Sequence, residues 1–446
     1  MQSKLNFQKF FSIIDRMNPI RQNGTVSQII GLVLESWGPV ASIGDVCYLQ
    51  PKIKKGITNS DFIPSLHLAE VVGFKNDKTL LMPLKELYGI APGDSVSTFR
   101  ETFSVAVGDE LLGRILDGLG NPIDDGPHVY LHEKRTVFAT PPNPLTRERI
   151  TEPLQLGIRA IDGLLTCGKG QRIGIFAGSG VGKSVTLGMM ARYTEADVNV
   201  IALIGERGRE VRDFIESDLG EECLKKSVVI VATSDQAALT RVKGALVATT
   251  IAEYFRDKGL NVLFMMDSVT RYCMALREIG LAVGEPPTTK GYTPSVFASL
   301  PKLLERAGTS EKGTITGIYT VLVDGDDMDE PIADAARSIL DGHIVLSRKI
   351  AAKNHYPAID VLNSISRVKN NVITSEHKDL ANRCIELLAI YKDAEDIINI
   401  GAYAKGSNFM IDQAIAKINL INDFLRQDVA EHSSFSETND KLKGIW

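Results

Sequence analysis

Apolar and polar residues alternate in short runs over residues 25–96, and this pattern predicts β-strands. Apolar residues gather over residues 26–34, 68–74 and 79–84, and Gly and Pro separate these runs. Short apolar runs bounded by turn-forming residues are typical of strands joined by tight connections. We therefore expect an all-β domain over residues 25–96, folded as a small barrel.

A second pattern occupies residues 97–372, where strand-like and helical stretches alternate. The strand-like stretches are residues 172–177, 199–204, 228–232, 262–266 and 315–323. This alternation indicates a parallel sheet flanked by helices, because a helical crossover lets the next strand run in the same direction. From residue 373 to residue 446 the chain is helical and charged without a strand signal. This last part predicts a helical C-terminal domain.

The first 24 residues show a third pattern. Phe7, Phe10, Phe11 and Ile14 fall on one face of a helix, and Asn18-Pro19 ends the pattern. This predicts a short amphipathic helix. It could pack on the chain's own core, dock a partner or lie on a membrane surface. Docking of a partner is favoured because the helix precedes the first domain.

Composition and charge narrow the class of protein. A chain of 446 residues is too long for one ordinary core and predicts two to four folded units. The net charge of -5, without a long basic block, argues against nucleic acid as a partner. The five cysteines are widely spaced and form no Cys-x-x-Cys pair, so we expect reduced thiols and a cytoplasmic location. No apolar run reaches the roughly 18 residues that span a bilayer, so membrane association should be peripheral.

Residues 177–184 form the strongest local motif of the chain. An apolar strand precedes them and a helical stretch from residue 185 to 191 follows, which is the order that a phosphate-binding P-loop requires. Ala177 stands where the common pattern has Gly, a departure that many P-loops tolerate. Glycines let backbone N–H groups wrap around the phosphates of a nucleotide, here expected to be ATP. The residues expected to bind it are Gly178, Ser179, Gly180, Val181, Gly182, Lys183, Ser184 and Val185.

Side chains for catalysis and for magnesium follow from the same motif. Lys183 is expected to meet the β- and γ-phosphates, and the Ser184 hydroxyl to bind Mg²⁺. Asp267 ends an apolar strand, where the acidic partner of that metal is expected. Glu206 follows another core strand and is our candidate general base, although a charged loop is more often a solvated surface.

Together these residues resemble the hexameric ATPases of the rotary type, which include the catalytic subunit of ATP synthase and its homologues in protein export. Within that group the sequence most resembles the flagellar and type III secretion export ATPases, and the segments over residues 35–39 and 42–47 resemble the flagellar branch. The resemblance covers nearly all of the chain. It is carried by residues 111–118 (LLGRILDG), 159–166 (RAIDGLLT), 267–272 (DSVTRY), 284–287 (GEPP) and 291–297 (GYTPSVF).

The resemblance implies the fold and the roles of further residues. The family's fold is an α/β P-loop core of the RecA-like type with an N-terminal β-barrel and a C-terminal helical domain. By position, Glu206 corresponds to the catalytic glutamate, and Arg207 accompanies it near the phosphates. Tyr356 matches the residue that stacks on adenine. Arg367 matches the arginine finger, which reaches into the site of the neighbouring subunit.

The resemblance also implies partners and a location. It predicts a homohexamer in which each subunit's arginine completes the next subunit's site. It further predicts a stator-like regulator at the N-terminal helix, a central stalk protein, export gate membrane proteins, export substrates and their chaperones. The ring is expected in the cytoplasm, peripherally associated with the inner-membrane export apparatus.

Three other functions compete with protein export. A catalytic subunit of a rotary proton or sodium ATPase is the main alternative, and the phrases over residues 284–297 count against it. A noncatalytic nucleotide-binding subunit would be expected to lack Glu206. An RNA-translocating hexamer would call for an aromatic and basic platform in the N-terminal domain, and residues 25–96 hold few aromatics.

Overall fold

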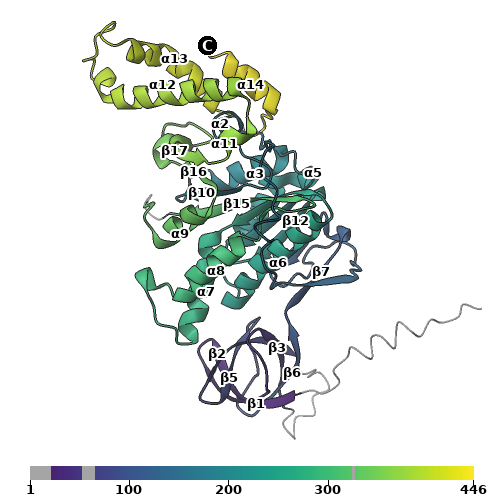
Figure 1. The fold of residues 1–446 in the computed structure, drawn as a ribbon. Helices are drawn as coiled ribbons and strands as arrows, with labels where there is room; N and C mark the ends of the chain where they lie inside the picture. The colour runs from purple at the N-terminus through teal and green to yellow at the C-terminus, as the bar shows by residue number, and fades with distance from the viewer. Residues whose placement is uncertain (1–21, 53–65, 324–326) are drawn as a thin grey trace, which may run out of the picture. The chain divides into compact units, whose positions relative to one another are not determined.

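The computed structural model describes residues 22–52, 66–323 and 327–446 (Figure 1). The side chains that predict the N-terminal helix, Phe7 to Ile14, lie outside the described residues, and residues 22–24 belong to the first strand. The chain divides into two compact units, which are described separately. One contains residues up to Ser104 together with Gln236–Thr240 and Glu278–Pro286, and the other contains the remainder.

Six strands of the first unit close into a barrel, as predicted. They are β1 (Gln22–Ile30), β2 (Val33–Trp37), β3 (Asp45–Gln50), β4 (His67–Lys75), β5 (Lys78–Pro83) and β6 (Ser95–Thr102). Neighbouring strands are antiparallel in the closed order β1-β2-β5-β4-β3-β6. Alternate side chains fill the interior, because successive residues of a strand point to opposite faces. The core includes Val26, Leu34, Leu49, Val71, Leu81 and Val96.

The apolar run over residues 26–34 is two strands and not one. The chain turns at Gly31, whose φ of 57° lies in the left-handed region that glycine adopts without strain. β1 ends at Ile30 and β2 begins at Val33, and these two residues pair across the hairpin. The sequence conceals this turn because apolar residues stand on both sides of the glycine.

The second unit is built on a mostly parallel sheet. Its described strands follow the order β17-β16-β10-β15-β13-β11-β12-β8, with β14 beside β15. Their bounds are β8 (Ile115–Asp117), β10 (Arg172–Ala177), β11 (Val198–Ile204), β12 (Ser227–Ala232), β13 (Asn261–Asp267), β14 (Gly308–Thr309), β15 (Thr314–Leu322), β16 (Gly342–Leu346) and β17 (Ile359–Ser366). The edge strand β17 runs antiparallel to β16, which the alternation in the sequence did not indicate.

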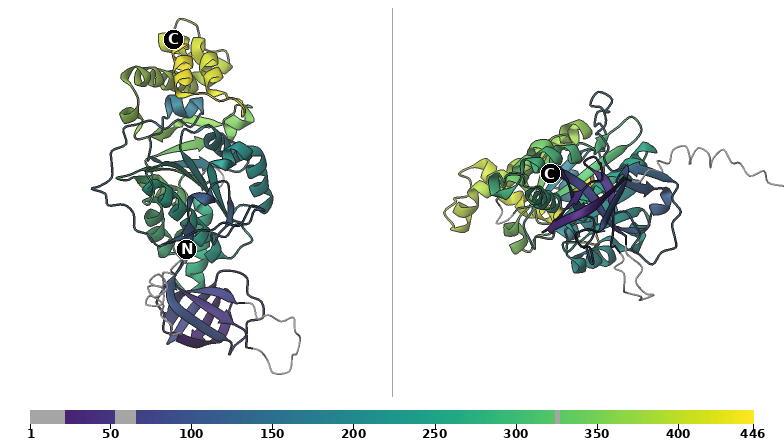
Figure 2. Two further views of the ribbon diagram at one scale, coloured as in Figure 1. Left: turned by 90° about the vertical axis from the view of Figure 1, so that its right-hand side faces the viewer. Right: turned by 90° about the horizontal axis from the view of Figure 1, so that it is seen from below.

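Helices cover both faces of this sheet (Figure 2). Every residue of β11 and of β12 is buried, which requires cover on both faces because side chains alternate between them. The helices between the strands are α2 (Arg159–Leu164), α3 (Lys183–Tyr193), α4 (Gly208–Asp213), α5 (Gly220–Lys225), α6 (Ala238–Asp257), α7 (Val269–Ala282), α8 (Pro294–Leu304), α9 (Pro331–Ile339) and α10 (Arg348–Ala352), and α11 (Lys369–Val372) follows the last strand. A small ribbon of β7 (Ser104–Val107) and β9 (Glu133–Thr136) stands apart from the sheet.

The chain after α11 is helical, as predicted. α12 (Ser375–Asn399) and α13 (Phe409–Leu425) lie side by side, and α14 (Phe435–Lys443) packs on α2 (Figure 1). Each of the three helices is preceded by a capping residue whose side chain accepts a backbone N–H of the first turn. The capping residues are Thr374, Asn408 and Ser434. Such caps satisfy donors that the first turn of a helix leaves open.

Candidate active site

The phosphate loop lies between the end of β10 and the start of α3. Its backbone passes through two left-handed residues, Gly180 (φ 76°) and Gly182 (φ 86°), which explains glycine at both positions. The Thr186 hydroxyl donates to the Gly182 carbonyl at 2.9 Å and holds the loop against the first turn of the helix. The open N–H groups and the dipole at this end of α3 favour a bound phosphate.

Three charged side chains predicted from the sequence meet beside this loop. The Lys183 ammonium lies 2.6 Å from Asp267 Oδ1 and 3.2 Å from Glu206 Oε1. The Thr320 hydroxyl donates to the same Asp267 oxygen at 2.6 Å. β10, β15, β13 and β11 are consecutive in the sheet, so their carboxyl ends bring these residues to one edge. The three predicted side chains therefore meet at one site, which is called the cleft below.

Burial and charge change how Glu206 and Lys183 titrate. Burial raises the pKa of Glu206 to about 7, with a further increase from the charge of Asp267 and an opposing effect of Lys183. Burial lowers the pKa of Lys183, but the two carboxylates outweigh it and the net shift is upward. A carboxylate with a pKa close to neutral is suited to take a proton from water.

The pH dependence of turnover follows from this pKa. A carboxylate can act as a base only when it is ionised, and a pKa of about 7 means that Glu206 loses this form as the pH falls below that value. We expect kcat/KM for ATP to fall about tenfold per unit on the acid side and to level off above about pH 8. Steady-state rates across this range measure it. A profile that stays flat down to about pH 5.5 would exclude Glu206 as the base.

Tyr356 lies at the last glycine of the phosphate loop. A β-carbon placed on Gly182 would stand 3.6 Å from Cδ1 and Cε1 of the Tyr356 ring, so the ring borders the loop. Tyr356 is 42% exposed as a residue, and its carbonyl accepts the Gln427 N–H at 3.0 Å. An aromatic face that is open to solvent and anchored through its backbone can stack on a nucleotide base.

Arg348 and Arg271 also border the cleft, and the sequence reasoning assigned neither a role. The Arg348 guanidinium packs on Gly178, where an added β-carbon would stand 2.7 Å from Nη2. Arg271 lies against Gly205, directly before Glu206. In the sequence, only their positions relative to the predicted strands could have indicated that they lie near the phosphate loop. Arg348 follows β16, which neighbours β10, and Arg271 lies in the first turn of α7, four residues after Asp267.

Arg207 follows the candidate base, but its side chain points outward. It is 81% exposed and pairs with Glu210 at 3.5 Å. The structure therefore brings Arg207 next to the cleft through its backbone position, while its guanidinium contacts neither Lys183 nor Glu206.

Arg367 lies at the opposite edge of the sheet from the phosphate loop. Its backbone N–H donates at 3.0 Å to the carbonyl of Asp341, whose own N–H donates at 2.8 Å to Arg172. Arg172 is the first residue of β10, and the phosphate loop follows the last. Six strand residues separate the two edges by about 17 Å. The antiparallel strand β17 explains this, because it begins beside Tyr356 and ends at Ser366.

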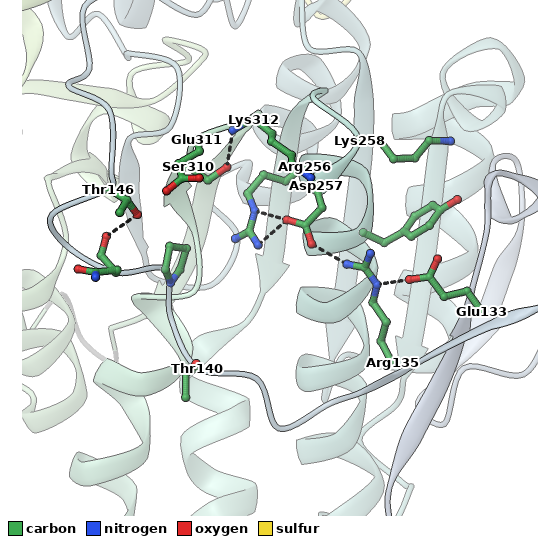
Figure 3. A pocket seen from close by; sticks show the side chains of 13 residues that line it. Glu133, Arg135, Thr140, Thr146, Arg256, Asp257, Lys258, Ser310, Glu311 and Lys312 are labelled. Atoms are coloured by element: carbon green, nitrogen blue, oxygen red, sulfur yellow. Dashed lines mark hydrogen bonds and ion pairs between the residues drawn. The ribbon is translucent and has the colours of Figure 1, made fainter. Parts of the chain in front are cut away.

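A polar pocket of about 590 Å³ lies on the edge away from the phosphate loop (Figure 3). Four of its charged side chains pair with one another. Arg135 contacts Glu133 at 2.6 Å and Asp257 at 2.7 Å, and Asp257 also accepts from Arg256 at 3.0 Å. Because these cations are already neutralised, the pocket offers a weak site for phosphate compared with the loop before α3.

Phosphate binding by a loop and a carboxylate able to take a proton near neutral pH are what cleavage of a nucleoside triphosphate requires. The described residues thus define a P-loop ATPase. All five cysteines are buried and unpaired. Within the described part of the chain, no helix combines the length and apolar character needed to cross a bilayer.

Comparison with known proteins agrees with this class. Residues 157–366 match the nucleotide-binding domain of the ATP synthase alpha/beta family, and residues 26–98 match its beta-barrel domain. Residues 373–444 match the C-terminal domain of the type III secretion ATPase EscN. The "Flagellum-specific ATP synthase" of Bacillus subtilis is 55% identical over 97% of both chains. The "Type 3 secretion system ATPase" of Xanthomonas euvesicatoria is 49% identical over 95% of this chain and 94% of its own.

Solved structures show the same relationship. The assembled ATPase EscN of the enteropathogenic E. coli type III secretion system is 50% identical, with a TM-score of 0.88 over 95% of this chain and 99% of its own. A second structure holds EscN with its central stalk EscO, at 49% identity and a TM-score of 0.86 over the same shares. The chain belongs to the family of flagellum-specific and type III secretion ATPases, within the ATP synthase alpha/beta superfamily. The resemblance read from the sequence is confirmed, ATP is the substrate, and the rotary proton or sodium ATPase is not favoured.

Proposed function

We propose that this chain hydrolyses ATP to energise protein export through a flagellar-type secretion apparatus, and that it works as a homohexameric ring. The observation that supports assembly into a ring is the separation of Arg367 from its own phosphate loop by the length of β10. An arginine at that edge can complete a site only in another copy of the chain. Head-to-tail contacts that close into a ring place it there at every interface. The assembled state of EscN supports the same arrangement.

The residues of the cleft take the following roles. Glu206 accepts a proton from the attacking water and orients it, and Lys183 binds the terminal phosphates. Arg207 assists beside the base after its side chain turns inward. Tyr356 stacks on adenine, and the loop residues Gly178 to Val185 cradle the phosphates. Arg367 of the next protomer stabilises the charge that develops on the transferred phosphoryl group.

Ser184 and Asp267 fit a magnesium ion. Among the described residues, the Ser184 hydroxyl has no hydrogen-bond partner and Asp267 Oδ2 accepts none, so both oxygens are open beside the phosphate loop. Hydroxyl and carboxylate oxygens are the ligands that this cation prefers. When bound with ATP, Mg²⁺ would neutralise charge on the phosphate oxygens. No described cluster of three or more acidic, His or Cys side chains could hold a metal alone, in keeping with a metal that arrives with the nucleotide.

Partners and location complete the proposal. The complex of EscN with EscO supports a central stalk protein as a partner of this chain also. A stator-like regulator would dock on the N-terminal helix, while export gate proteins, substrates and chaperones would meet the ring in the cytoplasm at the inner membrane. The predicted division assigns residues 1–24 to docking, 25–96 to the barrel, 97–372 to the ATPase domain and 373–446 to the helical domain. Because β1 begins at Gln22 and β6 ends at Thr102, we extend the barrel to residues 22–102.

A secretion assay in the source bacterium tests the export function. Replacing the chromosomal copy by Lys183→Ala, which removes the phosphate-binding ammonium, should reduce secreted flagellar-type substrates to background. Growth that depends on respiratory ATP synthesis should stay normal. The control is Lys225→Ala, which alters an exposed ion pair with Glu222 and should secrete normally. Loss of respiratory growth, or copurification with a membrane rotor, would identify a rotary ATPase and refute the proposal.

A further inference from the structure

The backbone that carries Arg367 is held by a small, partly buried network of hydrogen bonds. The Ser366 hydroxyl donates to the Thr166 carbonyl at 2.9 Å. The Gln171 side-chain amide donates to the Ser366 hydroxyl at 3.1 Å and to the Asp341 carbonyl at 3.0 Å. That carbonyl also accepts the Arg367 N–H at 3.0 Å. The Gln171 amide thus bridges the Ser366 hydroxyl and the Asp341 carbonyl. We call the Thr166 carbonyl, the Gln171 amide, the Ser366 hydroxyl and the Asp341 carbonyl the finger cradle.

Gln171 has little freedom to move. It is fully buried, and its side-chain oxygen accepts the Gly168 N–H at 2.9 Å. A β-carbon added to Gly342 would stand 2.4 Å from the Ile365 carbonyl oxygen and 3.4 Å from the Gln171 amide nitrogen. The strand end is therefore packed tightly around the cradle, and the position of Arg367 depends on these groups.

The cradle connects to the chain's own phosphate loop and to its C-terminal helices. Gln171 directly precedes β10, whose other end leads into the phosphate loop. The Arg172 guanidinium donates two hydrogen bonds to the Asp341 carboxylate, from Nε to Oδ2 at 3.0 Å and from Nη2 to Oδ1 at 3.3 Å. Thr166 follows α2, which packs against α12, α13 and α14. The base of Arg367 thus lies where these elements join.

The side chain of Arg367 contrasts with its anchored backbone. It is exposed, and within the described part of the chain its guanidinium makes no hydrogen bond or ion pair. An arginine held at its base and unpaired at its tip is available to a group outside its own protomer. Misplacement of a catalytic group by about 1 Å can cost about 10²-fold in rate, so the position of the Arg367 backbone matters.

We propose that Gln171 and Ser366 are positioning residues that aim Arg367 at the active site of the adjacent protomer. The inference rests on the proposed role of Arg367 as a finger that acts between subunits. Neither residue touches ATP, since both lie at the edge of the sheet away from the phosphate loop. Their effect passes through the backbone of residues 366 and 367 alone.

Ser366→Ala tests this with a small change. It removes the hydroxyl that joins Gln171 to Thr166, and we expect kcat to fall about ten- to a hundredfold while ATP affinity and ring assembly stay normal. The matched control is Ser364→Ala on the same face of β17, which removes a hydroxyl bonded to the Asp360 carbonyl and the Val345 N–H. It should keep kcat within about twofold of the parent. Gln171→Leu, similar in volume, should reproduce the Ser366→Ala defect.

Mixed rings separate positioning from a general structural role. Rings are formed with an excess of Glu206→Gln protomers, which have a dead site but an intact finger. A Ser366→Ala protomer has an intact site, so an adjacent finger of normal geometry should restore its turnover to near the parent rate. Arg367→Ala mixed in the same way is the reference, because it tests the finger itself.

Each outcome decides the matter. If Arg367→Ala is rescued and Ser366→Ala is not, the finger stands and the cradle proposal fails. If neither variant is rescued, Arg367 does not act between subunits, and the positioning role of Gln171 and Ser366 is refuted as well. Unchanged kcat in Ser366→Ala, or loss of ring assembly where the parent assembles, also overturns the proposal. Rescue of Ser366→Ala and Gln171→Leu together with Arg367→Ala supports it.

Discussion

Glu206→Gln should lower kcat for ATP hydrolysis by about 10² to 10⁴-fold while ATP still binds. The amide keeps the size of the side chain but cannot take a proton from water. It also keeps an oxygen that can accept from Lys183, which lies 3.2 Å away in the parent protein. Single-turnover hydrolysis measures the loss, and fluorescence titration with a nucleotide analogue measures binding.

A matched control separates this effect from a loss of surface charge. Glu216 pairs with Arg212 at 2.8 Å on an exposed helical face, so Glu216→Gln removes one carboxylate of the same length outside the cleft. This variant should keep turnover within about twofold. If Glu206→Gln retained more than about a tenth of the parent rate, the base would have to be another residue.

The barrel and the sheet were predictable because their signals are local. The strand predicted over residues 172–177 is observed with the same bounds, since it is buried on both sides and flanked by glycine. The hairpin at Gly31 was concealed, because Ile30 and Val33 continue the apolar run on both sides of the turn. The antiparallel direction of β17 could not be predicted, because strand direction depends on which neighbour the strand joins in the folded sheet.

The site residues also differ in whether a local sequence signal reveals them. Lys183 could be found because it ends the glycine loop that follows β10, and Glu206 because it stands two residues after β11. Tyr356 and Arg367 needed the family resemblance, since only ten positions separate them and nothing local shows that a strand carries them to opposite edges. Gln171 and Ser366 carry no motif at all. Their meaning comes from contacts between residues about 200 positions apart.

The edge strand β17 joins these observations. Tyr356 before it borders the phosphate loop of the same chain, and Arg367 after it lies at the far edge. Under the proposed roles, nucleotide binding at one end of the strand and transition-state stabilisation at the other would belong to two different sites of a ring. A shift of this strand would change both, which gives neighbouring sites a physical means of influencing each other.

Arg367→Ala should reduce turnover of the assembled ring by about 10³ to 10⁵-fold, because the forked guanidinium stabilises charge that appears only in the transition state. Since the side chain makes no ion pair within the described part of its own chain, folding should be unaffected. Steady-state ATPase rates measure the loss, and mass photometry confirms that rings form.

Two variants show whether the guanidinium itself is required. Arg367→Lys keeps the charge but loses the fork of donors, so it should recover only a small part of the lost rate. Arg212→Ala removes a surface arginine whose side chain is 78% exposed and should leave turnover within about twofold.

Mixed rings test whether Arg367 acts between protomers, because an arginine acting within its own chain predicts a different rate. The rate in rings that mix Arg367→Ala with Glu206→Gln must exceed the sum of the two variants measured alone, because only such rings join an intact base to an intact finger. A rate equal to that sum would place the essential arginine elsewhere.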